Sequence, residues 1–417
     1  MAGIDTGIAG CGIAGLACAL LLHRQGLHKI TLYERFDEPR PLGSGLMIQP
    51  TGLAVLEQLG LARQVFRCGA AVDRLYGKNA RGRVVLDARY AVLGRGGAFG
   101  IGIHRASLFS ALYDAVKAEG IEIRTGSEIT GSMLVPGGRN LLFADGSASP
   151  PHDLLIDALG IHTRLAPSVG RLLDFGALWT SLEWPADSPF DGSVLEQRYR
   201  AAREMVGVLP IGSGPGGGRP QLALFWSLRA DAVEGWREAG LTAWKDAVLR
   251  LWPECEGLLG QIADPAQLTF ARYAHRTLPD PVGERIVHIG DAWHSASPQL
   301  GQGANMALLD AFALATSLAR EGPLEQRLAH MLKLRRGHVQ LYQWLTAAFT
   351  PLYQSESALA ASLRDRLLAP LSRIGPAKWI QAMLVGGLAG APLGPLGLAM
   401  PDFGQPLVEK SKIAVTP

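Results

Sequence analysis

A glycine-rich turn near the N-terminus constrains the fold of this chain more than any other feature. Three glycines, Gly10, Gly12 and Gly15, stand in "GIAGCGIAG", directly ahead of a helix-forming run that ends near Arg24. Glycine permits a tight turn and lets the main chain approach a phosphate that a Cβ atom would exclude. The unpaired amides and positive dipole end of a following helix also favour an anion. The turn therefore predicts a pyrophosphate site.

The next segments complete a strand–helix–strand unit. The helix is expected to close at Gly26, and "HKITLYERF" (28–36) is typical of a second strand. Glu34 ends that strand at about the 20-residue spacing of a carboxylate that binds a ribose hydroxyl. Upstream, Asp5 and Thr6 are unusual in a strand buried on both faces, so we expect a short or weakened first strand. A glycine turn that binds nothing is the alternative, and the placement of Glu34 argues against it.

Composition narrows the class of protein. The chain has 417 residues, 48% of them hydrophobic and 18% charged, which predicts a large core shared by two interlocked domains. Lysines and arginines are scattered, so nucleic acid is not an expected partner. The four cysteines lack metal-ligand spacing and indicate buried thiols and no metal site. The N-terminus does not resemble a signal peptide, so we expect a cytoplasmic protein.

Downstream, the α/β pattern continues and is then interrupted. The segment "DLLIDALG" (153–160) is typical of a buried strand. Between residues 176 and 272, strand-like segments separated by glycine- and proline-containing loops precede a helical run. In "QLALFWSL", Phe225 and Trp226 fall on opposite faces, which suits either two packed faces or an aromatic pocket wall. This stretch predicts a second, sheet-bearing domain inserted into the first.

The segment from Arg285 to Ala319 carries the most specific pattern. An apolar strand ends at Gly290 and Asp291, and "GDAWHSASPQLGQGAN" then opens a long helix. With the N-terminal fingerprint and Arg105, this segment resembles the class A FAD-dependent aromatic monooxygenases, the para-hydroxybenzoate hydroxylase-like and ubiquinone-biosynthesis hydroxylase-like family. The resemblance covers most of the chain and implies that the glycine-rich turn holds the pyrophosphate of FAD.

The resemblance also implies roles for individual residues. Asp291 would hydrogen-bond the flavin ribityl chain, Pro298 would lie against the isoalloxazine, and residues 301–305 would present backbone amides to its pyrimidine edge. A helix N-terminus at that edge would stabilise negative charge on reduced flavin. The expected cofactor-binding residues are Gly10, Gly12, Gly15, Glu34, Arg35, Arg105, Ile129, Asp291, Pro298, Gly301, Gln302, Gly303, Ala304 and Asn305.

The expected fold is α/β, with a Rossmann-type FAD-binding domain, an inserted β-sheet-bearing substrate domain and a C-terminal helical region. Parts of the FAD-binding domain are expected at residues 1–72, 101–175 and 273–320, a substrate-side insertion at 73–100, the substrate domain at 176–272, and C-terminal helices with an apolar tail at 321–417.

The resemblance implies a monooxygenase in which reduced FAD and molecular oxygen form a C4a-hydroperoxide that hydroxylates a small aromatic or heteroaromatic substrate, with NADH or NADPH as co-substrate. No residue stands out as a catalytic base. Tyr199, Tyr273 and His275 are weak candidates, and each is more typical of a structural role. Two alternatives stay open: a flavin-dependent reductase or dehydrogenase of an isoprenoid or quinone-like lipid, and a flavin-binding subunit that no longer turns over.

One position departs from the family pattern. Where relatives carry an Asp-Gly pair in a "GADG"-like segment, this chain reads "DALG", so Leu159 replaces a carboxylate. A leucine cannot accept the hydrogen bonds of that carboxylate. Asp157 lies two positions earlier, which is the same side of an extended strand. From that spacing we expect Asp157 to replace the missing carboxylate in part. Either direct reduction by NADH or NADPH is slow here, or the change is neutral.

The C-terminal region is helical and then loosely apolar. No charged residue occurs between Trp379 and Pro401, but Pro392, Pro395 and several glycines make a membrane-spanning helix an unsuitable interpretation. We expect helices packed on the flavin domain and an apolar tail that covers the active-site domain, a second subunit in a homodimer, or a membrane surface.

Overall fold

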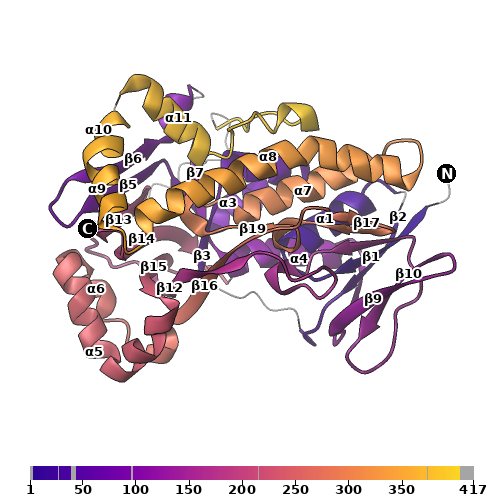
Figure 1. Ribbon diagram of the computed structural model, residues 1–417, viewed down its shortest axis with the longest axis horizontal. Coiled ribbons are helices and arrows are strands. Elements are labelled where there is room, and N and C mark those ends of the chain that lie inside the picture. Colours follow the sequence, from indigo (N-terminus) through magenta and orange to yellow (C-terminus); the bar gives the residue numbers. More distant parts are fainter. Residues whose placement is uncertain are drawn as a thin grey trace.

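The computed structural model describes residues 3–26, 28–38, 44–94, 97–214, 216–372 and 374–403. Figure 1 shows two sheet-bearing lobes, with the long helix α8 (Leu324–Tyr353) running along one side of both. The predicted α/β fold with a C-terminal helical region is confirmed.

The first lobe is built on a six-stranded sheet in the order β17-β18-β11-β1-β2-β8. All neighbouring pairs are parallel except β17 with β18. Its strands are β1 (Ile4–Ala9), β2 (His28–Tyr33), β8 (Glu122–Arg124), β11 (Leu154–Asp157), β17 (Val282–Gly283) and β18 (Ile286–His288). Helix α1 (Ile13–His23) packs against both α4 (Arg105–Ala118) and α7 (Gly303–Leu318). A hairpin of β9 (Ile129–Val135) and β10 (Gly138–Phe143) projects from this lobe.

The expectation of a weakened first strand is wrong. β1 has six residues at the centre of the sheet and pairs with β2 along its whole length. The polar residue Asp5 has partners from other segments of the chain. Its carboxylate accepts a hydrogen bond from Lys29 (2.9 Å) and contacts the His152 ring. Gly7 leaves room for that ring, since a Cβ atom there would come within 2.6 Å of it.

The second lobe is built on an eight-stranded sheet in the order β19-β16-β12-β15-β14-β13-β5-β6. The strands are β5 (Arg74–Asn79), β6 (Val84–Arg89), β12 (Arg171–Glu183), β13 (Val194–Arg200), β14 (Glu204–Ser213), β15 (Pro220–Arg229), β16 (Thr269–Thr277) and β19 (His294–Ser295). Helices α5 (Val233–Leu251) and α6 (Glu256–Leu259) cover one face, where Trp226 and Trp244 share a buried apolar cluster. On the other face Trp179 stacks on Phe225, with ring centroids 4.6 Å apart.

A small sheet joins the two lobes. It consists of β3 (Gly45–Ile48), β7 (Gly100–His104) and β4 (Ala70–Val72). Helix α2 (Pro50–Gln58) follows β3 in the chain, and helix α3 (Ala62–Cys68) precedes β4. Glycines allow it to pack closely on the large sheet, because a Cβ atom on Gly102 would overlap the carbonyl oxygen of Pro210. The face of β15 that carries Phe225 therefore turns toward the nucleotide-binding lobe.

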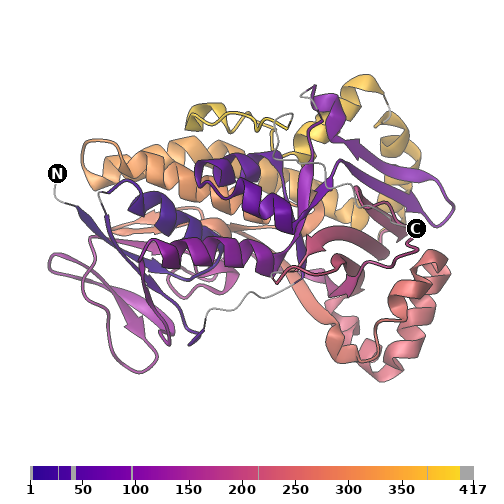
Figure 2. The ribbon, with the colours of Figure 1, turned by 180° about the vertical axis from the view of Figure 1, so that it is seen from behind.

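The C-terminal helices cover both lobes. α8 packs on α7, and α9 (Ala358–Leu363), a π-helical turn η8 (Arg364–Leu368), α10 (Ala369–Leu371) and α11 (Gly375–Val385) follow. α11 lies against β6 and the short helix η1 (Tyr90–Leu93). Seen from behind, the segment after α11 runs along the top of the molecule (Figure 2). Among the described residues, no helix combines the length and apolar character needed to cross a membrane.

Candidate cofactor cleft

A cleft of about 480 Å³ opens at the carboxyl ends of β1, β2 and β11, which is where doubly wound sheets bind ligands. Nine of the expected cofactor-binding residues line it: Gly10, Gly12, Glu34, Arg35, Arg105, Ile129, Asp291, Gly303 and Ala304. The other five expected residues do not line the cleft: Gly15, Pro298, Gly301, Gln302 and Asn305.

The three glycines of the turn differ in what they make room for. Gly10 has a positive φ of 102°, and a Cβ atom there would lie 2.7 Å from the carbonyl oxygen of Ala158. A Cβ atom on Gly15 would overlap the carbonyl oxygen of Gly10. On Gly12, by contrast, a Cβ atom would meet no described atom within 4 Å, and this residue lines the cleft. Gly10 and Gly15 therefore serve the packing of the protein, whereas Gly12 leaves space for a bound group.

Glu34 is held in place at the edge of the cleft. Its Oε2 accepts a hydrogen bond from the amide of Cys11 (3.0 Å), and its Oε1 accepts from the amides of Arg35 (2.8 Å) and Phe36 (3.3 Å). A carboxylate has about four acceptor sites, so these contacts leave capacity for one further donor. A ribose hydroxyl beside the glycine turn suits that capacity.

Asp291 faces the cleft from the other side. It lies in the short helix η6 (Gly290–Ala292) after β18, and no hydrogen bond to its carboxylate occurs within the described residues. The side chain is exposed in the cleft, whose walls surround it closely. Desolvation by these walls raises the pKa of the Asp291 carboxyl and outweighs the lowering effect of the positive charges of His294 and Arg105. An acceptor without a protein partner fits a ligand that brings hydroxyl donors, as the ribityl chain of a flavin does.

The loop around Asp291 is fixed from behind by a buried ionic network. Asp310 Oδ2 accepts hydrogen bonds from the Gly290 amide (3.0 Å) and from His294 (2.7 Å), and its Oδ1 accepts from Arg335 (2.8 Å). His338 continues the network, since Arg335 donates to its Nδ1 and its Nε2 contacts the carbonyl of Gly387. The Asp310 and Arg335 side chains are both inaccessible to solvent.

Sequence reasoning missed Asp310. An isolated carboxylate in the apolar helical run "NMALLDAFALA" was the available signal, because a buried Asp requires a partner. Burial opposes ionisation, but His294 and Arg335 hold the pKa of Asp310 down to about 2. The carboxylate is therefore charged at neutral pH and can anchor the Gly290–Asp291 turn.

The loop from Pro298 to Asn305 is tied to the rest of the protein by its side chains. Asn305 accepts from the amide of Gln49 (2.8 Å) and donates to the carbonyl of Met47 (3.1 Å). Gln302 donates to the carbonyl of Val385 (2.6 Å). These side chains fix the loop and point into protein, while Gly303 and Ala304 line the cleft at the N-terminus of α7, which has no side-chain cap.

The three weak catalytic candidates lie outside the lining of this cleft. Tyr199 donates a hydrogen bond to Gln197 (2.7 Å), and burial raises the pKa of both Tyr199 and Tyr273, so neither phenol acts as a base at neutral pH. Burial lowers the pKa of His275, whose Nε2 has no hydrogen-bond partner within the described residues. Tyr199 is therefore paired within its own strand, β13, and lies outside the cleft lining.

Asp157 does not replace the carboxylate that Leu159 lacks, so that expectation is wrong. Its Oδ1 accepts from the Leu159 amide (3.1 Å), and its Oδ2 accepts from Thr163 (2.6 Å) and contacts His288 Nδ1 at 2.6 Å. The side chain is fully buried, and Leu159 rather than Asp157 lines the cleft. The spacing rule for an extended strand does not relate the two side chains, because β11 ends at Asp157 and Leu159 has helical backbone angles (φ −71°, ψ −6°).

The fold and the cleft together define a doubly wound dinucleotide-binding protein. Residues 3–323 match the model of the FAD binding domain family, and the chain belongs to that family. The predicted membership in the FAD-dependent hydroxylase group is thereby confirmed, and FAD is its cofactor.

Several known proteins are similar to this chain. The putative 2-heptyl-3-hydroxy-4(1H)-quinolone synthase AqdB1 of Rhodococcus erythropolis is 26% identical over 345 residues, covering 81% of this chain and 86% of that protein. The 6-hydroxynicotinate 3-monooxygenase of Pseudomonas fluorescens is 26% identical over 345 residues, covering 78% and 85%. Among solved structures, Klebsiella pneumoniae HpxO complexed with FAD and uric acid has a TM-score of 0.79 at 18% identity, covering 91% and 97%.

Proposed function

We propose that this chain is an FAD-dependent monooxygenase that hydroxylates a small aromatic or heteroaromatic substrate with electrons from NADH or NADPH. The observation that carries the proposal is the convergence of Gly12, Glu34 and Asp291 with the start of α7 on one cleft. Similar proteins support the choice of reaction, since their names include 6-hydroxynicotinate 3-monooxygenase and 3-hydroxybenzoate 6-hydroxylase.

The residues of the cleft divide the cofactor among them. The turn at Gly10–Gly12 and the N-terminus of α1 would hold the pyrophosphate, Glu34 a ribose hydroxyl, and Asp291 the ribityl chain. The amides of Gly303 and Ala304 would meet the flavin ring, where the positive end of the α7 dipole favours negative charge. Bound FAD supplies the chemistry: it accepts a hydride and activates molecular oxygen for transfer to the ring.

We place the substrate against the inner face of the eight-stranded sheet. Trp179 and Phe225 are directly paired partners on β12 and β15 and stack on each other, and Gly207 leaves space that any Cβ atom would take from the Phe225 ring. Tyr273 lies on β16, the strand that pairs with β12 on its other side. An aromatic wall at a domain interface is suited to a flat ring and excludes water from it. Residues 176–272 would then supply most substrate contacts.

We also place the protein in the cytoplasm. Cys11 and Cys18 are buried free thiols, and burial raises the pKa of both. Unpaired cysteines and a need for reduced nicotinamide cofactors both suit a reducing compartment.

Purification followed by FAD titration and substrate screening tests the proposed function. We expect a yellow protein that oxidises NADH or NADPH in an oxygen-dependent manner when a suitable aromatic compound is added. A colourless protein that does not take up FAD at micromolar concentration would contradict the proposal. Reduction of a quinone-like lipid at the same rate with and without oxygen would instead identify the reductase alternative.

Replacing Leu159 by Asp is expected to accelerate flavin reduction by NADH or NADPH by about tenfold. One restored charge-assisted hydrogen bond contributes roughly 1.5 to 3 kcal/mol, and about 1.4 kcal/mol corresponds to a factor of ten in rate. Anaerobic stopped-flow bleaching of the flavin, with substrate present, measures this step. Leu159→Asn is the matched control, because it adds a polar group without charge. Fast bleaching in the parent protein, unchanged in Leu159→Asp, would show that the leucine is neutral.

A further inference from the structure

The C-terminal helices carry an unusual concentration of exposed apolar side chains. Seven large apolar residues between residues 359 and 380 are exposed, whereas the remaining described chain has only five such residues. We call this group the C-terminal ridge, and it consists of Leu359, Leu363, Leu367, Leu371, Ile374, Trp379 and Ile380. Their exposed fractions run from 42% for Leu363 to 80% for Leu359. Concentrated apolar surface on a folded protein indicates an interaction site.

The ridge is a regular face of these helices and does not result from loose packing. Its four leucines recur every fourth residue, which places them along one side of α9, η8 and α10. The opposite side is fixed, because the buried Arg364 donates hydrogen bonds to the carbonyls of Leu352 and Ala201, both at 3.0 Å. The helices are therefore held firmly with their leucines directed outward.

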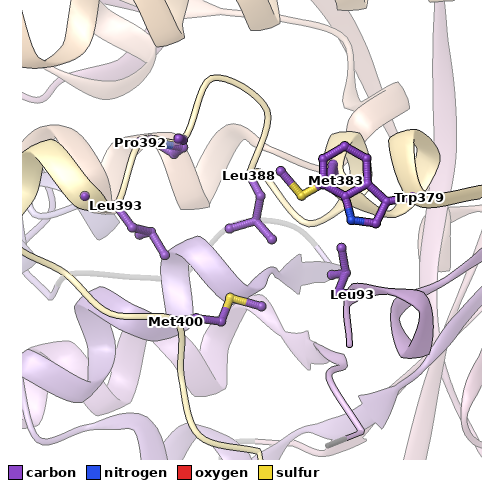
Figure 3. A pocket seen from close by; sticks show the side chains of 9 residues that line it. Leu93, Trp379, Met383, Leu388, Pro392, Leu393 and Met400 are labelled. Carbon is purple, nitrogen blue, oxygen red and sulfur yellow. The ribbon is translucent and has the colours of Figure 1, made fainter. Parts of the chain in front are cut away.

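An apolar pocket continues the ridge toward the protein. It has a volume of about 320 Å³ and is lined by Leu93, Trp379, Met383, Leu388, Leu393 and Met400, among others. Figure 3 shows Leu93, Leu388 and Met400 pointing toward one another around this space, with Trp379 at its edge. Because Trp379 belongs to both the pocket and the ridge, the two form one continuous apolar surface.

The charge of this region selects the partner. Arg366 and Lys378 are exposed on the same helices. Asp365 is the only acidic residue between 358 and 385, and its carboxylate is already occupied by Arg364 (2.8 Å) and by Asn79 (2.7 Å). In a symmetric dimer docked ridge to ridge, both faces would carry these cations and Asp365, already paired, would not neutralise them, which disfavours that dimer. An apolar face with leucines, a tryptophan and flanking cations is typical of helices that lie in the boundary of an anionic bilayer.

We infer that the C-terminal ridge docks this enzyme on the surface of an anionic lipid bilayer. The leucines and Trp379 enter the region between headgroups and acyl chains, and Arg366 and Lys378 contact lipid phosphates. Strands β1 and β2, whose ends bear the cofactor cleft, lie in the opposite lobe from α9–α11 (Figure 1), so docking leaves the cleft accessible. This inference does not depend on the proposed reaction.

Vesicle flotation of the full-length, FAD-loaded protein tests the inference. The protein is expected to float with vesicles of phosphatidylglycerol and phosphatidylcholine and to bind pure phosphatidylcholine at least tenfold more weakly. The Leu363→Glu/Leu367→Glu variant should bind the anionic vesicles at least tenfold more weakly than the parent. Arg366→Gln/Lys378→Gln should reduce both the binding and its dependence on salt.

Leu134→Glu is the matched control. The exposed fraction of Leu134, 43%, is close to the 42% of Leu363, but Leu134 lies on the β9 hairpin at the other end of the molecule (Figure 1). FAD content and thermal midpoint establish that each variant is folded. A parent protein that does not float, or an equal loss with Leu134→Glu, overturns the inference. So does a concentration-dependent dimer in sedimentation that Leu363→Glu dissociates without any lipid binding, because the ridge is then a contact between copies.

Discussion

Replacing Gly12 by Ala is expected to weaken FAD binding by about tenfold or more without destabilising the cofactor-free protein. The backbone of Gly12, at φ −76° and ψ −178°, is open to alanine, and the new methyl group would meet no described atom within 4 Å. It would occupy the cleft where the main chain must approach a phosphate. A loss of about 1.4 kcal/mol in binding corresponds to the tenfold change. Titration of the apoprotein with FAD measures it.

Gly15→Ala is the matched variant with the opposite signature. Its methyl group would overlap the carbonyl oxygen of Gly10, so the turn itself must shift, at a cost of roughly 1 to 3 kcal/mol in the unfolding free energy of the apoprotein. Urea unfolding separates the two variants. If Gly12→Ala binds FAD as tightly as the parent, the pyrophosphate does not lie at this turn.

Replacing Asp310 by Asn is expected to lower the unfolding free energy by about 3 to 5 kcal/mol. Arg335 would keep its charge in a site without solvent access and lose its anionic partner, and removing one member of a buried pair has a cost of this order. Asparagine keeps only one acceptor oxygen, so either Arg335 or the Gly290 amide with His294 would face an NH2 group, and we expect weaker FAD retention through a displaced Asp291. Chemical denaturation and FAD titration measure the two effects.

Asp87→Asn provides the control, because Asp87 pairs with Arg74 and Arg89 in a partly exposed position and should change stability by about 1 kcal/mol or less. The pH dependence gives a second readout. The pKa of Asp310 is lowered to about 2 in the folded protein, so its contribution is present above the ordinary carboxyl pKa near 4 and is lost as the pH falls toward 2. The parent should lose stability more steeply than Asp310→Asn in that range. Equal slopes would contradict an ionised Asp310.

Local patterns were sufficient to predict the nucleotide-binding unit. The glycine spacing and the position of Glu34 depend on a turn and two adjacent strands, and the structure brings both to one cleft. The full length of β1 was not predictable from the sequence. Asp5 is accommodated in this strand by a contact with His152, which lies on a distant segment. The spacing of Asp157 from Leu159 was also misleading, because the strand ends at Asp157 and His288, from another segment, takes up the carboxylate.

The loop before α7 shows a second limit of sequence reasoning. The motif predicted backbone contacts for Asn305, but the motif does not reveal that its side chain joins the loop to Gln49 and Met47. Asp310 was missed because its three partners come from η6, β19 and α8, which meet only in the folded protein. The residues that support this site are therefore less visible in sequence than the residues that line it.

Turnover under isotope-labelled dioxygen tests the central claim most directly. The FAD-loaded protein is supplied with NADPH or NADH and an aromatic compound that stimulates its oxidation, and the product is analysed by mass spectrometry. A monooxygenase inserts one oxygen atom of dioxygen into the ring and reduces the other to water at the expense of one reduced nicotinamide. We expect a hydroxylated product that carries one labelled atom per molecule. A product whose new oxygen comes from water, or a substrate oxidised without dioxygen, would contradict the assignment.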